Sequence, residues 1–307
     1  MSRVTEARGT ELFEQTKRWG RWGGDDERGA LNLLTPERVG RAVTLARTGR
    51  VISCGRELPV VPAADNPLPA LHHMVAAGDL APGPGLQASA DFIGVSFHGM
   101  AVSHIDALCH VFVDGQMYNG FPASDVTSRG ARHGSIMAGS GGIVGRGVLL
   151  DIPRLRGVEW LEPGDVITPD ELDAAASAQS VAVEPGDVVL VSTGRDARRA
   201  QHGAWNPSDP GLAGLDPECV AWMHAHDPAV VGSDGVSDVL PANPHRWPMP
   251  IHQCLIVGMG VHLLDNLRLD RLAVACADEQ RWEFLFVVAP LQVGGGTGSP
   301  VNPVAVL

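Results

Sequence analysis

The chain has 307 residues, of which 44% are hydrophobic and 19% charged, a composition typical of a folded globular protein and unlike that of a disordered one. Its 23 basic and 35 acidic residues give a formal net charge of -12, the wrong sign for a protein that binds along phosphate backbones, so we expect no nucleic-acid partner. Lys17 is the only lysine and no G-x-x-x-x-G-K-[ST] motif occurs, which excludes a P-loop nucleotide-binding protein.

The cysteines and the apolar segments indicate the compartment. Five cysteines are scattered along the chain without a C-x-x-C pair, which is typical of reduced thiols. Residues 1–20 contain no apolar stretch of the signal-peptide kind, and no apolar run approaches the roughly 18 residues needed to span a bilayer. We therefore expect a cytoplasmic protein with no membrane partner.

The first ninety residues predict two helices and an irregular segment. A short helix is expected within 11–22, before a glycine-rich stretch. Thr35 as N-cap and Pro36 at the first helical position predict a helix over about 36–47. Residues 57–90 carry repeated Pro and Gly without a clear period. Because long segments of this kind are usually lids or partner contacts, we expect an arm or a lid there.

From residue 91 onward, short β-like runs alternate with helical candidates. The predicted strands are 148–153, 187–194, 228–235 and 284–291, and the predicted helices are 169–178, 216–226 and 267–277. This alternation favours an α/β fold.

Three histidines and an aspartate lie close together in the stretch FHGMAVSHIDALCH, namely His98, His104, Asp106 and His110. They share the same parity, so one unbroken strand would place them on one face, yet His98 and His110 would then lie roughly 40 Å apart. The chain must therefore turn. If a helical turn begins after Asp106, then Asp106 and His110, four residues apart, lie on one helix face.

The pair His104 and Asp106 offers an imidazole nitrogen and a carboxylate oxygen, a set that suits zinc or manganese and leaves positions free for water and substrate. The alternative is that His104 is hydrogen-bonded in the core and Asp106 caps a helix. Burying such a cluster without a cation would leave many donors and acceptors to satisfy. The spacing alone leaves both interpretations open.

The run from Ser103 to His110 resembles the second half of the H-x-G-T-H-x-D-x-P-x-H signature of the cyclase family of metal-dependent hydrolases, which includes kynurenine formamidase and isatin hydrolase. WGRWGGDDERGALNLLTPE, DGQMYNG, GSDGVSD, GVHLLDNLRLDRLA and GTGSPVNPVAV resemble the longer branch of that family, so the resemblance covers most of residues 19–307. It implies one compact α/β domain over 1–307, of the swivelling β/β/α type, with a mixed, small barrel-like sheet flanked by helices. Homodimers or homotetramers are also implied, and the arm at 57–90 could then cross to a neighbour.

The resemblance implies that His104 and Asp106 bind one or two divalent metals, zinc or manganese, and that His110 transfers protons. The first histidine of the signature falls on Met100 here. We expect His98, two residues earlier, to take the vacant role if the loop bulges.

Two further ligands are implied near residue 260. The later histidine and glutamate of the family fall on His252 and Asp265, and aspartate shortens the reach by one methylene. His262 is the rival in this stretch, for which we favour packing or a hydrogen bond to a ligand. Trp22 is expected to form a wall of the substrate pocket, and Cys109, with odd parity, is expected to pack as a small apolar residue.

The implied activity is the opening of a small amide, cyclic imide or lactone by metal-activated water, with His110 as general acid and base. Two alternatives stay open. One is a lyase or dehydratase that uses the same metal to stabilise an enolate. The other is a non-catalytic ligand-binding protein, favoured if the departures at Met100 and Asp265 have removed the metal.

Overall fold

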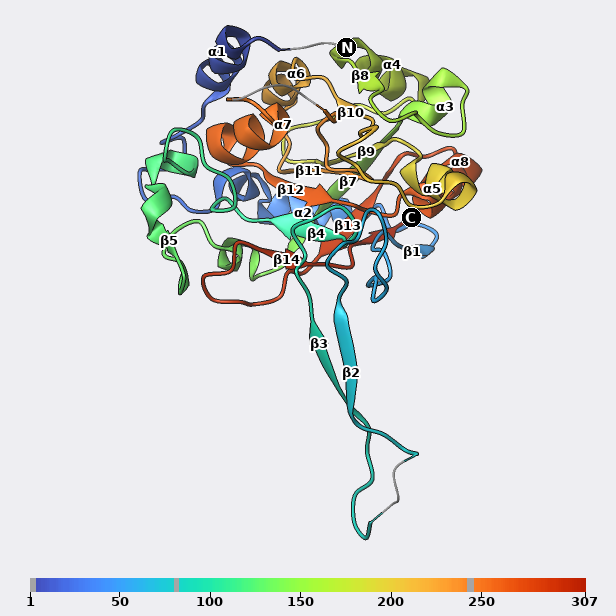
Figure 1. The fold of residues 1–307 in the computed structure, drawn as a ribbon. Coiled ribbons are helices and arrows are strands. Elements are labelled where there is room, and N and C mark those ends of the chain that lie inside the picture. The colour runs from blue at the N-terminus through green and yellow to red at the C-terminus, as the bar shows by residue number, and fades with distance from the viewer. Residues whose placement is uncertain (1–3, 80–82, 242–245) are drawn as a thin grey trace.

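The computed structural model describes residues 4–79, 83–241 and 246–307. Nine strands of this part of the chain form one mixed sheet that curls into a half-barrel (Figure 1). In spatial order they are β1 (Val51–Ser53), β15 (Val304–Val306), β13 (Glu283–Val288), β7 (Ile143–Asp151), β9 (Val188–Ser192), β11 (Val230–Ser233), β12 (His262–Asp265), β4 (His104–Asp106) and β14 (Gly298–Pro300). Strands β7, β9, β11 and β12 run parallel, and the outer neighbours pair antiparallel. The predicted α/β class is confirmed.

Both faces of the sheet are buried. Successive residues along a strand point to opposite sides, so a strand that is buried on both faces contributes to two cores. In β9, Val189 and Val191 belong to one hydrophobic core and Val188 and Leu190 to the other. Helices α1 (Glu6–Thr16), α4 (Pro169–Ala178) and α6 (Cys219–His226) contribute to the first core, and α8 (Asp270–Glu279) contributes to the second. The uninterrupted apolar run in β9 is typical of a parallel strand covered on both sides.

The predicted helices form, with different ends where local hydrogen bonds decide. Helix α4 spans the predicted residues because Thr168 and Glu171 make a capping box. Helix α2 (Pro36–Val43) begins at the predicted residue but ends before 47, because the hydroxyl and the backbone N–H of Thr44 both donate to the carbonyl of Arg41. Helix α1 begins earlier than predicted, where the Thr5 side chain accepts from the N–H of Arg8.

The remaining elements are short. They are helices α3 (Ile152–Arg156), α5 (Arg195–His202) and α7 (Pro250–His252), the π-helix η5 (Gln253–Met259), the 3₁₀-helices η1 (Gly29–Leu33), η2 (Tyr118–Gly120), η3 (Ala123–Asp125) and η4 (Ile136–Gly139), and the strand pairs β5 (Val126–Thr127) with β6 (Gly130–Ala131) and β8 (Val166–Ile167) with β10 (Gly214–Leu215). Within the part of the chain that the structure describes, every helix is too short or too polar to span a bilayer.

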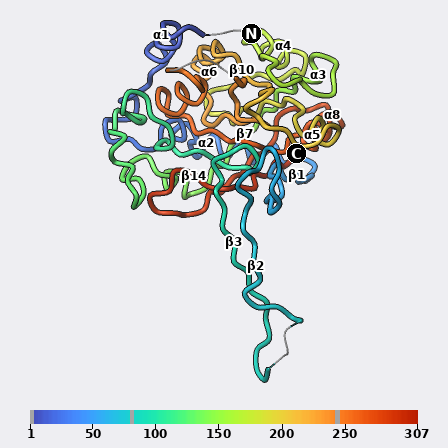
Figure 2. Tube along the Cα trace, viewed as in Figure 1, coloured from blue at the N-terminus to red at the C-terminus, as the bar shows by residue number. Residues whose placement is uncertain are grey.

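A hairpin of β2 (Leu71–Ala76) and β3 (Ala90–Gly94) projects away from the body of the molecule (Figures 1 and 2). It overlaps the segment 57–90, in which an arm or a lid was expected. The hairpin carries exposed apolar side chains, among them Val75 and Phe92, which are 68% and 51% exposed. A two-stranded hairpin without cover is at best marginally stable in water.

We predict that the chain assembles as homodimers or homotetramers through this hairpin, because a second copy would cover its exposed apolar side chains. Size-exclusion chromatography with light scattering should give a mass of two or four chains of 32.3 kDa. Serine at both Val75 and Phe92 should shift the mass towards one chain, whereas serine at Val274, a 57% exposed valine on α8, should not. A monomeric wild-type protein would contradict the prediction.

Candidate metal centre

Strand β4 brings the first two site residues together. His104 and Asp106 lie two residues apart on one face of β4, and the antiparallel register with β12 places Asp265 opposite His104. After Asp106 the chain makes a tight turn, in which the N–H of His110 donates to the carbonyl of Ala107 at 3.0 Å. This turn replaces the predicted helical one, and it leaves Nε2 of His110 3.9 Å from Oδ1 of Asp106.

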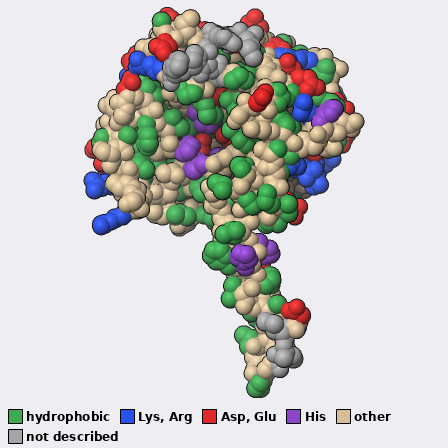
Figure 3. All heavy atoms as spheres, in the orientation of Figure 1, with side chains coloured by type: hydrophobic (Ala, Val, Ile, Leu, Met, Phe, Trp, Pro, Cys, Tyr) green, Lys and Arg blue, Asp and Glu red, His purple; other side chains and the backbone are tan. Residues whose placement is uncertain are grey.

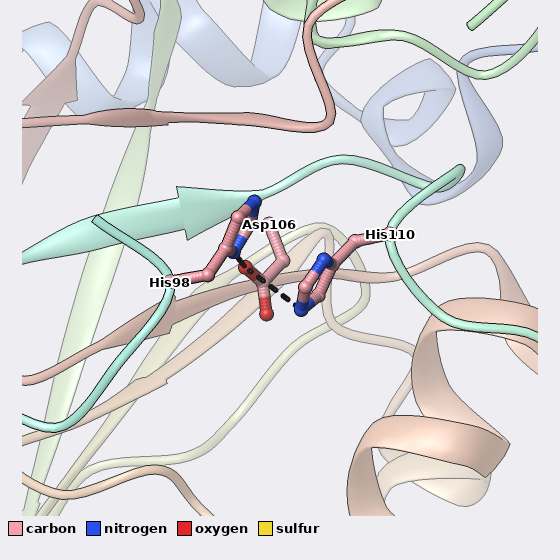
Figure 4. Close-up of side chains that lie close together, drawn as sticks. All are labelled: His98, Asp106 and His110. Carbon is pink, nitrogen blue, oxygen red and sulfur yellow. Dashed lines mark ion pairs between the residues drawn. The ribbon is translucent and has the colours of Figure 1, made fainter. Parts of the chain in front are cut away.

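The chain also folds back before β4, so that His98 reaches the same carboxylate (Figure 4). Nδ1 of His98 lies 3.0 Å from Oδ1 of Asp106, and its Nε2 lies 3.0 Å from the hydroxyl of Thr297. The rings of His98 and His110 stack in parallel, with centroids 3.7 Å apart and planes 3° apart. Two residues that a straight strand would separate widely therefore touch, because the chain turns on both sides of β4.

The opposite side of Asp106 faces His252. This residue ends α7, directly before the π-helix η5, a type of turn that is frequent at functional sites. Nε2 of His252 lies 3.5 Å from Oδ2 of Asp106 and 3.2 Å from Oδ2 of Asp265. Nδ1 of His252 donates to Oδ2 of Asp238 at 2.6 Å, which orients the ring.

The site brings together atoms that can only accept hydrogen bonds. Nδ1 of His104 donates to the carbonyl of Val102 at 2.8 Å, so Nε2 of a neutral His104 presents its lone pair to Asp106. His252 does the same, because its Nδ1 is bonded to a carboxylate. Both oxygens of Asp106 and Oδ1 of Asp265 are buried without a hydrogen-bond donor. Such lone pairs repel one another unless a cation or a proton lies between them.

The donor set fits a divalent metal. Among the described residues, two groups of three present ligand atoms within 4.8 Å of one another, and both groups include Asp106. The groups are His104, Asp106 and Asp265, and His98, Asp106 and His110. Imidazole nitrogens with carboxylate oxygens suit zinc or manganese.

The pKa values follow from burial and from the charges. Burial disfavours the charged form of His104, but the carboxylates of Asp106 and Asp265 outweigh it and raise the pKa of His104. Burial likewise opposes the ionised form of Asp106, yet the surrounding histidines hold its pKa well below the usual value. Burial dominates at His110 and lowers its pKa to about 4, so this imidazole is neutral at pH 7.

A cavity of about 430 Å³ opens over these residues, where histidines gather in a hollow of the surface (Figure 3). The described residues that line it include no lysine or arginine. Beyond the cluster, the walls are Gly99, Met100, Val111, Phe112, Val236, Pro248, Met249 and Gln253. A mostly apolar pocket with a few convergent polar groups is typical of a small-molecule site.

The structure gathers six sequence-predicted residues around one point, namely His98, His104, Asp106, His110, His252 and Asp265. Trp22 is not among the described lining residues. Its ring packs on the core beneath the guanidinium of Arg21, and its contact with substrate stays a prediction. His262 is buried outside both groups, and its ring nitrogens have no hydrogen-bond partner. Cys109 packs in the second core, as its parity predicted.

The sequence reasoning assigned no role to Asp238 or Thr297. Both lie in stretches that resemble the cyclase family, GSDGVSD and GTGSPVNPVAV. Asp238 follows β11, and side chains beyond the carboxyl ends of parallel strands commonly line ligand sites in α/β sheets. That topological signal could have identified Asp238. No comparable signal marks Thr297, because its partner His98 is 199 residues away in the sequence.

When the chain is compared with known proteins, the match to a family model and the match to solved structures indicate the same family. The model of the cyclase family matches residues 61–238. A crystal structure described as a novel cyclase is 31% identical, with a TM-score of 0.82 over 96% of this chain and 99% of that chain.

More distant structures share the fold. Isatin hydrolase A from Labrenzia aggregata is 22% identical, with a TM-score of 0.60 over 83% of this chain and 93% of that chain. A structure from Bacillus stearothermophilus, described as a predicted metal-dependent hydrolase, is 18% identical, with a TM-score of 0.50 over 83% of this chain and 97% of that chain. A comparison with curated proteins finds no match.

We predict that Asp238→Asn lowers the free energy of unfolding of the metal-free protein by about 1–3 kcal/mol. The two carboxylate oxygens accept from the N–H of Ile251, the N–H of His252 and Nδ1 of His252. The asparagine side chain has one acceptor oxygen instead of two, and its NH₂ group would face one of these donors. Urea unfolding should show the loss, and Asp25→Asn, the same change at an exposed residue, should leave the midpoint in place. Equal midpoints for the two variants would contradict this role.

Proposed function

The chain belongs to the cyclase family, and on that premise we propose that it is a metal-dependent hydrolase that opens a small amide, cyclic imide or lactone. The observation that carries the proposal is the convergence of buried acceptor atoms on Asp106 beneath an open pocket. The hydrolases among the structures that share the fold support hydrolysis as the type of reaction. The five cysteines, all free and buried, support a cytoplasmic location.

His104, Asp106, His252 and Asp265 would hold one divalent ion, zinc or manganese. Although aspartate is shorter than glutamate by one methylene, Oδ2 of Asp265 lies 3.2 Å from Nε2 of His252, so the strand register supplies the reach. His98 presents a further nitrogen to Oδ1 of Asp106, which allows a second ion. When bound, such an ion lowers the pKa of water towards about 7 and polarises a carbonyl oxygen.

His110 is suited to proton transfer. It lines the pocket, and its side chain keeps 29% of its exposure. Because burial keeps the imidazole neutral, its free nitrogen accepts a proton from the attacking water and delivers it to the departing nitrogen or oxygen. The stacked ring of His98 fixes the plane of His110, and a fixed ring loses less entropy when the substrate binds.

The pocket walls favour a compact, neutral substrate. Val111, Phe112, Val236, Pro248 and Met249 present apolar surface, and Phe112 is 42% exposed. The amide of Gln253 is already engaged with the backbone of Arg246 and Met249. The described walls thus offer no cationic group to pair with a charged substrate, which fits an uncharged amide, imide or lactone.

The metal is tested by elemental analysis of tag-free protein. We expect one or two equivalents of zinc or manganese per chain, and their loss in Asp106→Ala, since both groups of ligands share this residue. Asp25→Ala, at an exposed aspartate, should keep the metal. Protein that takes up neither ion after incubation would refute the proposal and favour a ligand-binding protein on the same fold.

The reaction type is tested with His110→Ala on whichever amide, imide or lactone the wild-type protein opens. The variant should retain its metal and lose about 10²- to 10⁴-fold in kcat, because proton transfer is removed. Phe112→Ala should mainly raise KM, since it removes apolar contact area from the wall of the substrate pocket. Full activity in His110→Ala would sink the assignment, and loss of metal would make His110 a ligand. Product without oxygen from ¹⁸O-labelled water would indicate a lyase instead.

A further inference from the structure

The loop that carries His98 is held from behind by two side chains that lie outside the cluster. Nδ2 of Asn266 donates to the carbonyls of Gly99 at 2.7 Å and Val102 at 3.2 Å. The guanidinium of Arg195 donates to the carbonyl of Met100 at 2.5 Å and to Oδ1 of Asn266 at 2.6 Å. Three carbonyls of one short loop therefore converge on a single connected pair of side chains.

This pair is itself tied to the body of the protein. Arg195 is 3% exposed and Asn266 is fully buried. Asn266 directly follows Asp265, in the left-handed region with a φ of 54°, where its N–H donates to the carbonyl of Gly235. Arg195 begins α5, and its N–H donates to the carboxylate of Asp234 at 3.2 Å. The pair thus links the end of β12, which carries Asp265, to the loop of His98.

The His98 loop lies directly after the projecting hairpin. Four residues before His98, strand β3 ends and leads back into the hairpin, away from the body of the molecule (Figure 1). The imidazole itself contacts Asp106 and Thr297 at its two nitrogens and stacks on the ring of His110. Burying a guanidinium is costly, so one that donates both to a carbonyl of this loop and to the side chain that holds the loop points to a function for the loop geometry.

We propose that Arg195 and Asn266 are positioning residues that set the 98–102 loop so that Nδ1 of His98 faces Asp106; the inference rests on the metal-binding function proposed above. Neither side chain touches the metal ligands' donor atoms in the described contacts. They act through the backbone carbonyls of Gly99, Met100 and Val102. His104 lies on a regular strand, and the register of that strand sets its position. His98 lies on a loop, so the shape of the loop sets its position instead.

A double-mutant cycle tests this action through His98. Zinc affinity is measured by competition with a chromogenic chelator for Arg195→Met and Asn266→Gly, each in the wild-type and in the His98→Ala background. Each variant should weaken zinc binding about 10- to 100-fold in the wild-type background, as loss of an outer partner of a ligand typically does. In the His98→Ala background Arg195→Met should cause no further loss, because the ligand it positions is absent. Asn266→Gly should lose less there than in the wild-type background, and what remains arises at Val102, whose carbonyl also holds Nδ1 of His104. Equal losses in both backgrounds, or none, would overturn the proposal.

A second readout does not depend on metal. The ¹H–¹³C NMR signal of the His98 Cε1 group in the apo protein should shift in Arg195→Met, because the ring leaves its stack on His110. An unchanged signal would overturn the inference, whether or not the wild-type protein binds zinc. Absence of zinc binding by the wild-type protein would refute only the proposed function. Arg146→Met is the matched control, since it removes a largely buried arginine that pairs with Asp187 and Glu283 on another part of the sheet.

Asn266→Gly guards against a variant that fails to fold. Glycine adopts a positive φ without strain, and the backbone bonds of residue 266 to Gly235 and to the hydroxyl of Ser103 remain. If Arg195→Met unfolds, Asn266→Gly decides the outcome by the same two readouts.

Discussion

The buried carboxylate of Asp106 is the constraint on which the site depends. Its side chain is 1% exposed, its oxygens have no hydrogen-bond donor, and they face His98, His104 and His252. A carboxylate in this setting is costly unless positive charge compensates it. The short strand β4, held between β12 and β14, fixes the carboxylate at the place where both groups of ligands meet.

The partners around this carboxylate are oriented from outside. The carbonyl of Val102 and the carboxylate of Asp238 each accept a hydrogen bond from Nδ1 of a histidine, so the other nitrogen of each ring turns inward. Arg195 and Asn266 hold the carbonyls of the His98 loop from the other side. The pocket above is apolar, which lowers the local dielectric and strengthens every charge interaction within it.

Regular elements could be predicted where local chemistry agrees with packing. The run VVLV in β9 and the capping box at the start of α4 are signals contained in a few neighbouring residues. The end of α2 and the strand β2 could not be found in this way. The first depends on hydrogen bonds of Thr44, and the second lies in a segment whose Pro and Gly content masks its strand.

The ligand types follow from the sequence, and so does the need for a turn, because His98 and His110 lie too far apart in one straight strand to share an ion. The tertiary structure alone decided that His98 and His110 stack and that Asp265, rather than His262, joins the cluster. It also showed that Asp238 orients the ring of His252. The reason is physical: strand register and the closure of long loops decide which distant side chains meet, and neither is encoded in local spacing.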